Sequence, residues 1–170
     1  KENSGSAISI TLVKIEPQDW GDYVIQYGTE QGIIGATISV NEDSSKEIKV
    51  LNSNITIAIT SLTSGTFAFT VAAPNGTQPS VIAIEIADIN TILNSKISSL
   101  KHIAVSFDGQ PLSLANNFQE IFEYSSDAQP VWAGLITEKK CYLLIPSHFS
   151  THTIIISTLQ EQLNTPMMLF

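Results

Sequence analysis

Residues 54–87 read NITIAITSLTSGTFAFTVAAPNGTQPSVIAIEIA, and this stretch decides the fold class. In its first part Ile55, Ile57 and Ile59 alternate with Thr and Ala, the pattern of a strand that buries one face. The same alternation returns in two further segments, and turn residues separate the three: the segments are 66–72 and 80–87, and the turns are Ser64-Gly65 and Pro74-Asn75-Gly76. Strands and turns at this spacing are typical of a β-sandwich or barrel.

The same reading extends to both sides of this stretch. Further strands are predicted at Ala7–Ile15, Asp22–Tyr27, Ile33–Val40, Lys46–Leu51, His102–Phe107, Val131–Ile136, Cys141–Ile145 and Thr151–Ser157. Two short helices are expected, one capped by Asp88 and running to Leu100, the other holding Leu114, Phe118, Ile121 and Phe122 at spacings of three and four. The prediction is an all-β chain forming a single β-sandwich, jelly-roll or immunoglobulin-like, with one or two short helical insertions.

Composition excludes several classes of partner. The 170 residues carry 16 Asp and Glu against 8 Lys and no Arg, for a net charge of -8. Because the chain has no Arg and no basic patch, nucleic acid and anionic membrane surfaces are poor binding partners for it. No apolar run reaches the length of a bilayer span, so we expect no membrane insertion.

No group of residues has the spacing of an enzyme site. His148, Ser150 and His152 lie close together beside Ser147 and would share one face of a strand, but no Gly-x-Ser-x-Gly motif or neighbouring carboxylate accompanies them. Two histidines four residues apart suit a metal on a helix, and this segment is strand-forming instead. We therefore predict no catalytic residues, no metal site and no cofactor, so the chain is expected not to be an enzyme.

Other chemically distinctive residues have structural explanations. Cys141 is the single cysteine and lies in an apolar strand, which predicts an inert buried thiol. Glu42 and Asp43 share a polar loop that is expected to be solvated. Trp20 and Trp132 could form a stacking surface for a glycan, together with Tyr23, Tyr27 and Tyr124, but core packing is the simpler expectation.

The N-terminal segment carries the most information about function. Ile8, Ile10 and Leu12 would lie on one face of an extended strand, and Ser9, Thr11 and Val13 on the other. Such a strand can close its own sheet or complete the sheet of a neighbouring copy by strand addition. The predicted donor strand comprises Ala7, Ile8, Ser9, Ile10, Thr11, Leu12, Val13 and Ile15. Residues 1–15 are thus expected to form a leader with the donor strand, and residues 16–170 the sandwich domain.

Two features point to export from the cell. The chain starts at Lys1 without Met, as expected for a product from which a signal peptide has been removed. Asn54 and Asn75 lie in Asn-x-Thr sequons and are predicted glycosylation sites. An extracellular or cell-surface location follows as an expectation.

The segment Leu144–Ile154, LIPSHFSTHTI, resembles the closing motif of β-sandwich domains in archaeal cell-surface proteins. The wider layout is similar to that of archaeal bundling-pilus and thread subunits and of camelysin-type matrix fibre proteins of bacilli. The resemblance implies that residues 7–15 complete the sheet of the next subunit.

These observations predict a structural subunit of an extracellular filament or pilus that assembles with copies of itself by donor-strand complementation, for adhesion or biofilm. Two alternatives remain open. One is a monomeric cell-surface domain that binds a glycan or protein, and the other is a protein associated with a surface layer.

Overall fold

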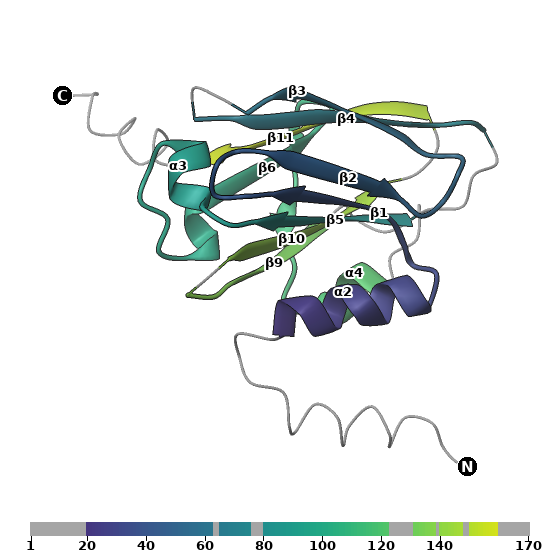
Figure 1. Cartoon of the computed structure of the whole chain (residues 1–170), viewed down its shortest axis with the longest axis horizontal. Helices are drawn as coiled ribbons and strands as arrows, with labels where there is room; N and C mark the ends of the chain where they lie inside the picture. The colour runs from purple at the N-terminus through teal and green to yellow at the C-terminus, as the bar shows by residue number, and fades with distance from the viewer. Residues whose placement is uncertain are drawn as a thin grey trace, which may run out of the picture.

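The computed structural model describes residues 20–62, 65–75, 80–122, 131–138, 140–147 and 150–159. These residues form two stacked β-sheets with helices against one outer face (Figure 1). The predicted all-β sandwich with short helical insertions is therefore confirmed. The predicted strand Ala7–Ile15 lies outside the described residues.

The first sheet has six strands in the order β2-β1-β5-β10-β9-β8. Their bounds are β1 Ile34–Val40, β2 Lys46–Val50, β5 Ser80–Ile86, β8 Ser113–Leu114, β9 Val131–Ile136 and β10 Cys141–Ser147. β1 pairs with β5 in parallel, as β8 does with β9, and the other neighbours are antiparallel. The parallel pair β1–β5 requires the chain to cross into the second sheet and return, which alternation within each strand does not predict.

The second sheet has five antiparallel strands in the order β3-β4-β11-β6-β7. Their bounds are β3 Thr56–Ser61, β4 Phe67–Ala73, β6 Ile103–Phe107, β7 Gln110–Pro111 and β11 Ser150–Thr158. β6 and β7 are joined by Asp108-Gly109, whose φ angles of 52° and 84° are both positive. Positive φ at both central residues is the geometry of the tight hairpin turn that Asp-Gly favours.

The space between the sheets is the main hydrophobic core. Phe67, Phe69 and Val71 of β4 face the other sheet, and the two phenylalanine rings lie 5.5 Å apart. Ile82, Ile84 and Ile86 of β5 are completely buried on the opposite side of the same core, as their alternation predicted.

A second, smaller core lies on the outer face of the six-stranded sheet. Val81 and Leu144 on that face pack with Val24 of helix α2 (Trp20–Glu30) and Ile121 of helix α4 (Phe118–Phe122). β10 is consequently buried along its whole length, because the sandwich covers one face and the helices cover the other. The described residues thus form three layers: helices α2 and α4, the six-stranded sheet and the five-stranded sheet (Figure 1).

The prediction of a strand at Asp22–Tyr27 is wrong, because these residues belong to α2. Apolar side chains at positions 20, 23, 24 and 27 recur at helical spacing, which outweighs the β-propensity of the segment. Gly21 and Gly28 are buried and let the helix lie close to the sheet. A Cβ atom at Gly21 would lie 2.3 Å from the ring of Tyr142 on β10.

The helix predicted after Asp88 forms but is shorter than expected. Asp88 caps α3 (Ile89–Leu93), and its Oδ1 accepts a hydrogen bond from the Thr91 amide at 3.2 Å. The helix ends at Asn94, which adopts a left-handed conformation with φ 52°. Leu100–His102 then forms a separate 3-10 turn, η2.

The second predicted helix is also shorter than expected. Phe118, Ile121 and Phe122 lie in α4, but Leu114 belongs to β8. Among the residues described, no helix is long and apolar enough to cross a membrane.

Candidate functional site

The edge of the five-stranded sheet at β3 differs in composition from the other described sheet edges. Among the described strands, β3 is the outermost of its sheet and pairs with β4 on one side. Its sequence, TIAITS, has no charge and no proline. Edge strands are normally protected from pairing by charges, proline, shortness or bulges. β3 has no charge and no proline over its six residues, and its one irregularity in register lies at its end, between Ile59 and Ser61.

The other three sheet edges in the described structure are protected. β2 carries Lys46, Glu47 and Lys49, all exposed. β7 and β8 are two residues long, and β7 contains Pro111. The contrast singles out β3 as the edge on which a further strand can be accommodated.

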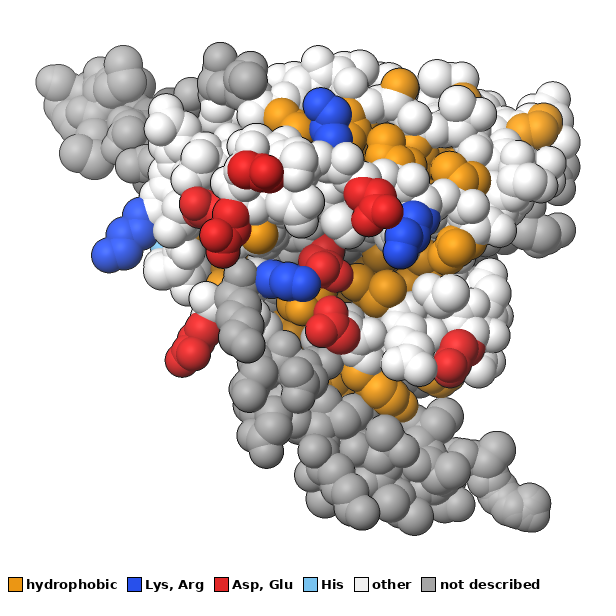
Figure 2. Space-filling model, in the orientation of Figure 1, with side chains coloured by type: hydrophobic (Ala, Val, Ile, Leu, Met, Phe, Trp, Pro, Cys, Tyr) orange, Lys and Arg blue, Asp and Glu red, His pale blue; other side chains and the backbone are white. Residues whose placement is uncertain are grey.

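The core beneath this edge is incompletely covered. Ile57 and Ile59 of β3 and Ile48 of β2 pack against the main core but stay partly exposed. Figure 2 shows hydrophobic side chains reaching the surface over β3 and β2. On the outward face of β3 the side chains of Thr56, Ala58 and Thr60 are exposed. An added strand with one apolar face would therefore cover the three isoleucines.

The two predicted glycosylation sites flank one end of this edge. Asn54 is exposed in the turn before β3, where its backbone amide donates to Oδ1 of Asn52 at 3.0 Å. Asn75 is exposed just after β4. Because Thr56 pairs with Ala72, both asparagines lie at the same end of the β3–β4 pair.

A groove of about 520 Å³ lies at the opposite edge of this sheet, around β6. Ile103, Val105 and Trp132 border it from the core side, and Leu114 on β8 borders it with 37% of its surface exposed. The complete lining is Leu100, Lys101, Ile103, Ala104, Val105, Ser106, Gly109, Pro111, Leu112, Leu114, Trp132, Ile155, Ser157 and Leu159. The groove is thus largely apolar and touches both sheets.

The histidine and serine residues near the last strand differ in burial. His152 is buried, with 8% of its surface exposed, whereas Ser150 is exposed at the start of β11 with φ 84°. This positive φ interrupts the extended backbone, so the expected shared face does not form. Ser147 is buried on β10, and His148 lies outside the described residues.

A carboxylate does accompany His152, contrary to the sequence expectation. Nδ1 of His152 lies 2.7 Å from Oδ2 of Asp108, which is in the turn between β6 and β7. The ring of His152 also lies 4.5 Å from the ring of Phe107. The pairing joins residues 44 positions apart, so sequence proximity could not reveal it.

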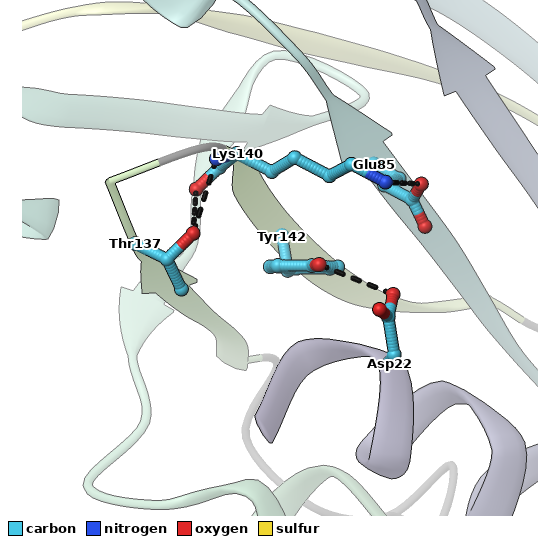
Figure 3. A network of polar contacts seen from close by, with 5 residues as sticks. All are labelled: Asp22, Glu85, Thr137, Lys140 and Tyr142. Carbon is cyan, nitrogen blue, oxygen red and sulfur yellow. Dashed lines mark hydrogen bonds and ion pairs between the residues drawn. The ribbon is translucent and has the colours of Figure 1, made fainter. Parts of the chain in front are cut away.

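A network of polar side chains connects the six-stranded sheet to α2 (Figure 3). Nζ of Lys140 lies 2.6 Å from Oε1 of Glu85, and the hydroxyl of Tyr142 donates to Oδ1 of Asp22 on α2 at 3.1 Å. The amide of Lys140 donates to Oγ1 of Thr137 at 3.0 Å. The hydrogen bond that Lys140 donates to Glu85 raises the pKa of Lys140 above its usual 10.5. The network fixes the helix layer to the sheet.

Cys141 is buried and Asp43 is exposed, as the sequence predicts. Cys141 is buried, and burial raises the pKa of its thiol from 9.0 to about 12, so it is protonated near neutral pH. Asp43 is exposed, and its pKa is lowered by hydrogen bonding to Ser45. No cluster of three or more metal-ligating side chains occurs within the described ranges.

The two tryptophans have different surroundings. Trp132 is 2% exposed in the core. Trp20, Tyr23, Tyr27 and Phe122 form a partly exposed aromatic row, with successive ring centroids 6.1, 6.5 and 5.7 Å apart. Tyr124 lies outside the described residues. The helical spacing of positions 20, 23 and 27 is the sequence signal that could have placed these rings together.

No protein-family model and no curated protein matches the chain. A Flavobacterium johnsoniae GH31 dextranase complexed with glucose is similar over 55% of this chain, at 17% identity and a TM-score of 0.36. A mutant of the same enzyme complexed with isomaltotriose is similar over 55% of the chain, at 16% identity and a TM-score of 0.37. The chain spans 11% of the length of either structure. Similarity this weak indicates neither fold nor activity.

Proposed function

We propose that the chain is a structural subunit of an extracellular filament that serves adhesion or biofilm formation. Residues 7–15 of one copy add to the open edge of β3 in the next copy. The observation that supports this proposal is the uncharged edge of β3 beside the partly exposed Ile57 and Ile59.

The donor segment complements this edge in chemistry. Its apolar face, Ile8, Ile10 and Leu12, would lie beside Ile57 and Ile59 on the core-facing side of the sheet. Burial of three aliphatic side chains contributes about 1.5–3 kcal/mol each. Backbone pairing along β3 adds roughly 1 kcal/mol for each hydrogen bond. Against these gains stands the loss of translational and rotational freedom, about 4–15 kcal/mol. A joint of this size can hold two subunits together.

The layer order favours pairing between copies over pairing within one chain. α2 begins at Trp20 in the helix layer, and β3 lies in the five-stranded sheet on the other side of the molecule (Figure 1). With layers about 10 Å apart, the separation across the stack is roughly 20 Å. The five residues from Ile15 to Trp20 span at most about 17 Å. Pairing to a neighbour is head-to-tail, and such contacts generate open fibres.

The proposal is tested on the full-length chain with Ile10→Asp and Leu12→Asp combined. We expect the unchanged protein to form filaments in electron micrographs and the variant to sediment as a single species of about one subunit mass, because two charges on the apolar face prevent burial. The control is Ser9→Asp with Thr11→Asp, which places the same charge on the opposite face and should leave filaments intact. Filaments in the Ile10/Leu12 variant would overturn the proposal.

A second function is favoured by the aromatic row of Trp20, Tyr23 and Tyr27. Partly exposed aromatic rings on a rigid helix suit stacking against sugar rings, as in a monomeric cell-surface binding domain. Binding of purified surface glycans that is lost on Trp20→Ala, together with a discrete monomer in sedimentation of the unchanged protein, would favour this function over the filament. A protein that sediments alone and binds only isolated surface-layer material would instead fit the surface-layer alternative.

A further inference from the structure

The groove around β6 lacks an occupant from the described part of the chain. Ala104 and Ser106 on β6 and Ile155 and Ser157 on β11 contribute outward-facing positions to its lining, since Ile103, Val105, Ile154 and Ile156 face the core. Trp132 and Leu114 border it on the side of the six-stranded sheet. An apolar groove of this kind is typical of a binding surface.

We propose that residues 160–170 of the same chain bind in this groove. Leu159 lines the groove, and its amide donates to the carbonyl of His102 at 3.0 Å. The segment that follows is therefore attached to a residue in the wall of the groove. Among the segments outside the described residues, 160–170 is the one joined directly to a residue that lines the groove.

The composition of the segment matches the lining. Leu163 and Pro166–Phe170 are apolar and can cover Leu114 and Leu112. Glu161 follows Leu159 by two positions and can reach Lys101, the cation in the lining. The opposite charges of Glu161 and Lys101 lie near the start of the segment, and the apolar contacts come later. Together they fix the direction in which the segment runs along the groove.

The segment is also long enough. Eleven residues in extended conformation reach at most about 36–40 Å, and the four residues from Leu159 to Leu163 about 13–14 Å. Leu163 can therefore contact lining side chains close to Leu159, and Phe170 can reach the more distant Leu114. This occupant is independent of the filament proposal, which concerns the opposite edge of the sheet at β3.

A disulfide between the segment and the groove tests the inference. In the full chain, Leu114→Cys is combined with Leu169→Cys and oxidised; Cys141 stays in place because its thiol is buried. We expect an intrachain disulfide, detected as faster migration without reductant. The control pairs Leu169→Cys with Val50→Cys, which is similarly exposed at 42% but lies on β2 at the other edge of the six-stranded sheet. Linked dimers, equal linkage in both pairs, or no linkage would overturn the inference.

A second measurement avoids dependence on disulfide geometry. The rate at which iodoacetamide modifies Leu114→Cys should rise several-fold when Leu169→Asp and Phe170→Asp are added, because the charged segment leaves the groove. The rate for Val50→Cys should not change. An unchanged rate at position 114 would contradict occupation of the groove by this segment.

Discussion

Asp108, in the turn after β6, contacts His152 on β11, and both oxygens of its carboxylate bind this strand. Oδ2 lies 2.7 Å from Nδ1 of His152, and Oδ1 accepts the backbone amide of Thr153 at 2.8 Å. The Asp108 amide in turn donates to the Thr153 carbonyl at 2.8 Å. The β6–β7 turn is thus attached to β11, and the buried imidazole of His152 has a partner.

The first prediction concerns this attachment. Asp108→Ala should lower the free energy of unfolding by about 1–3 kcal/mol, because a buried ring nitrogen loses its partner. Asp108→Asn should cost less, since Asn adopts the positive φ of 52° and still offers an oxygen acceptor. Urea denaturation measures both. Glu42→Ala, which removes an exposed carboxylate from the loop after β1, is the control and should leave the urea midpoint nearly unchanged.

The second prediction concerns the ion pair between Lys140 and Glu85. A double-mutant cycle with Lys140→Met and Glu85→Gln should give a coupling energy of about 0.5–1 kcal/mol, because both side chains are partly exposed. The pKa of Lys140 is raised in the folded state, so this contribution is complete below pH 10.5 and is lost as the pH rises above it. When the cycle is measured at neutral pH with added salt, the coupling energy should be smaller. Additive single effects would show that the pair contributes nothing.

The third prediction concerns Cys141. Its thiol should not react with a disulfide reagent in the folded protein at neutral pH, and it should react fully in urea, because burial holds its pKa near 12. The protonated thiol is favoured on folding, so the stabilisation is complete below pH 9.0 and declines as the pH rises from 9.0 towards 12. In Cys141→Ala this part of the alkaline decline should be absent. Rapid reaction of the native protein would show that β10 opens.

The fourth prediction concerns the close approach of α2 to the sheet. Gly21→Ala should destabilise the protein by about 1–3 kcal/mol, because its Cβ would lie 2.3 Å from the Tyr142 ring. Thr29→Ala, exposed on the same helix, should have an effect within about 0.5 kcal/mol. Thermal or urea unfolding of both variants makes the comparison. Equal destabilisation by the two substitutions would contradict the prediction, because it would mean that α2 shifts away from Tyr142 at little cost.

Sequence reasoning predicted the sandwich well because its strands have strong two-residue periodicity. Ile82, Ile84 and Ile86 share one face regardless of which strands are their neighbours. The parallel pairing of β1 with β5 was not predictable in this way, because neighbour order depends on the path of the chain between sheets. The error at Asp22–Tyr27 came from β-forming residue types that also fit a helix, where Gly21 and Gly28 decide the packing.

Contacts between distant residues limited prediction of the sites. Asp108 was not connected to His152 because the two are 44 positions apart, and only the pairing of β6 with β11 brings them together. The groove around β6 combines residues from η2, β6, β8, β9 and β11, and no single segment indicates it. In contrast, the lack of charge in residues 56–61 is visible in the sequence, and only the sheet order reveals that these residues form an edge.

The most direct test of the filament proposal mixes two variants, each with one added cysteine beside the buried Cys141. One carries a cysteine at position 8, 10 or 12 in turn, and the other carries Ile57→Cys on β3. The proposal predicts a disulfide-linked dimer for at least one mixture and none when Lys49→Cys on β2 replaces the partner. Absence of every linked dimer, or a disulfide that forms only within one chain when both cysteines are combined, would contradict donor-strand exchange at β3.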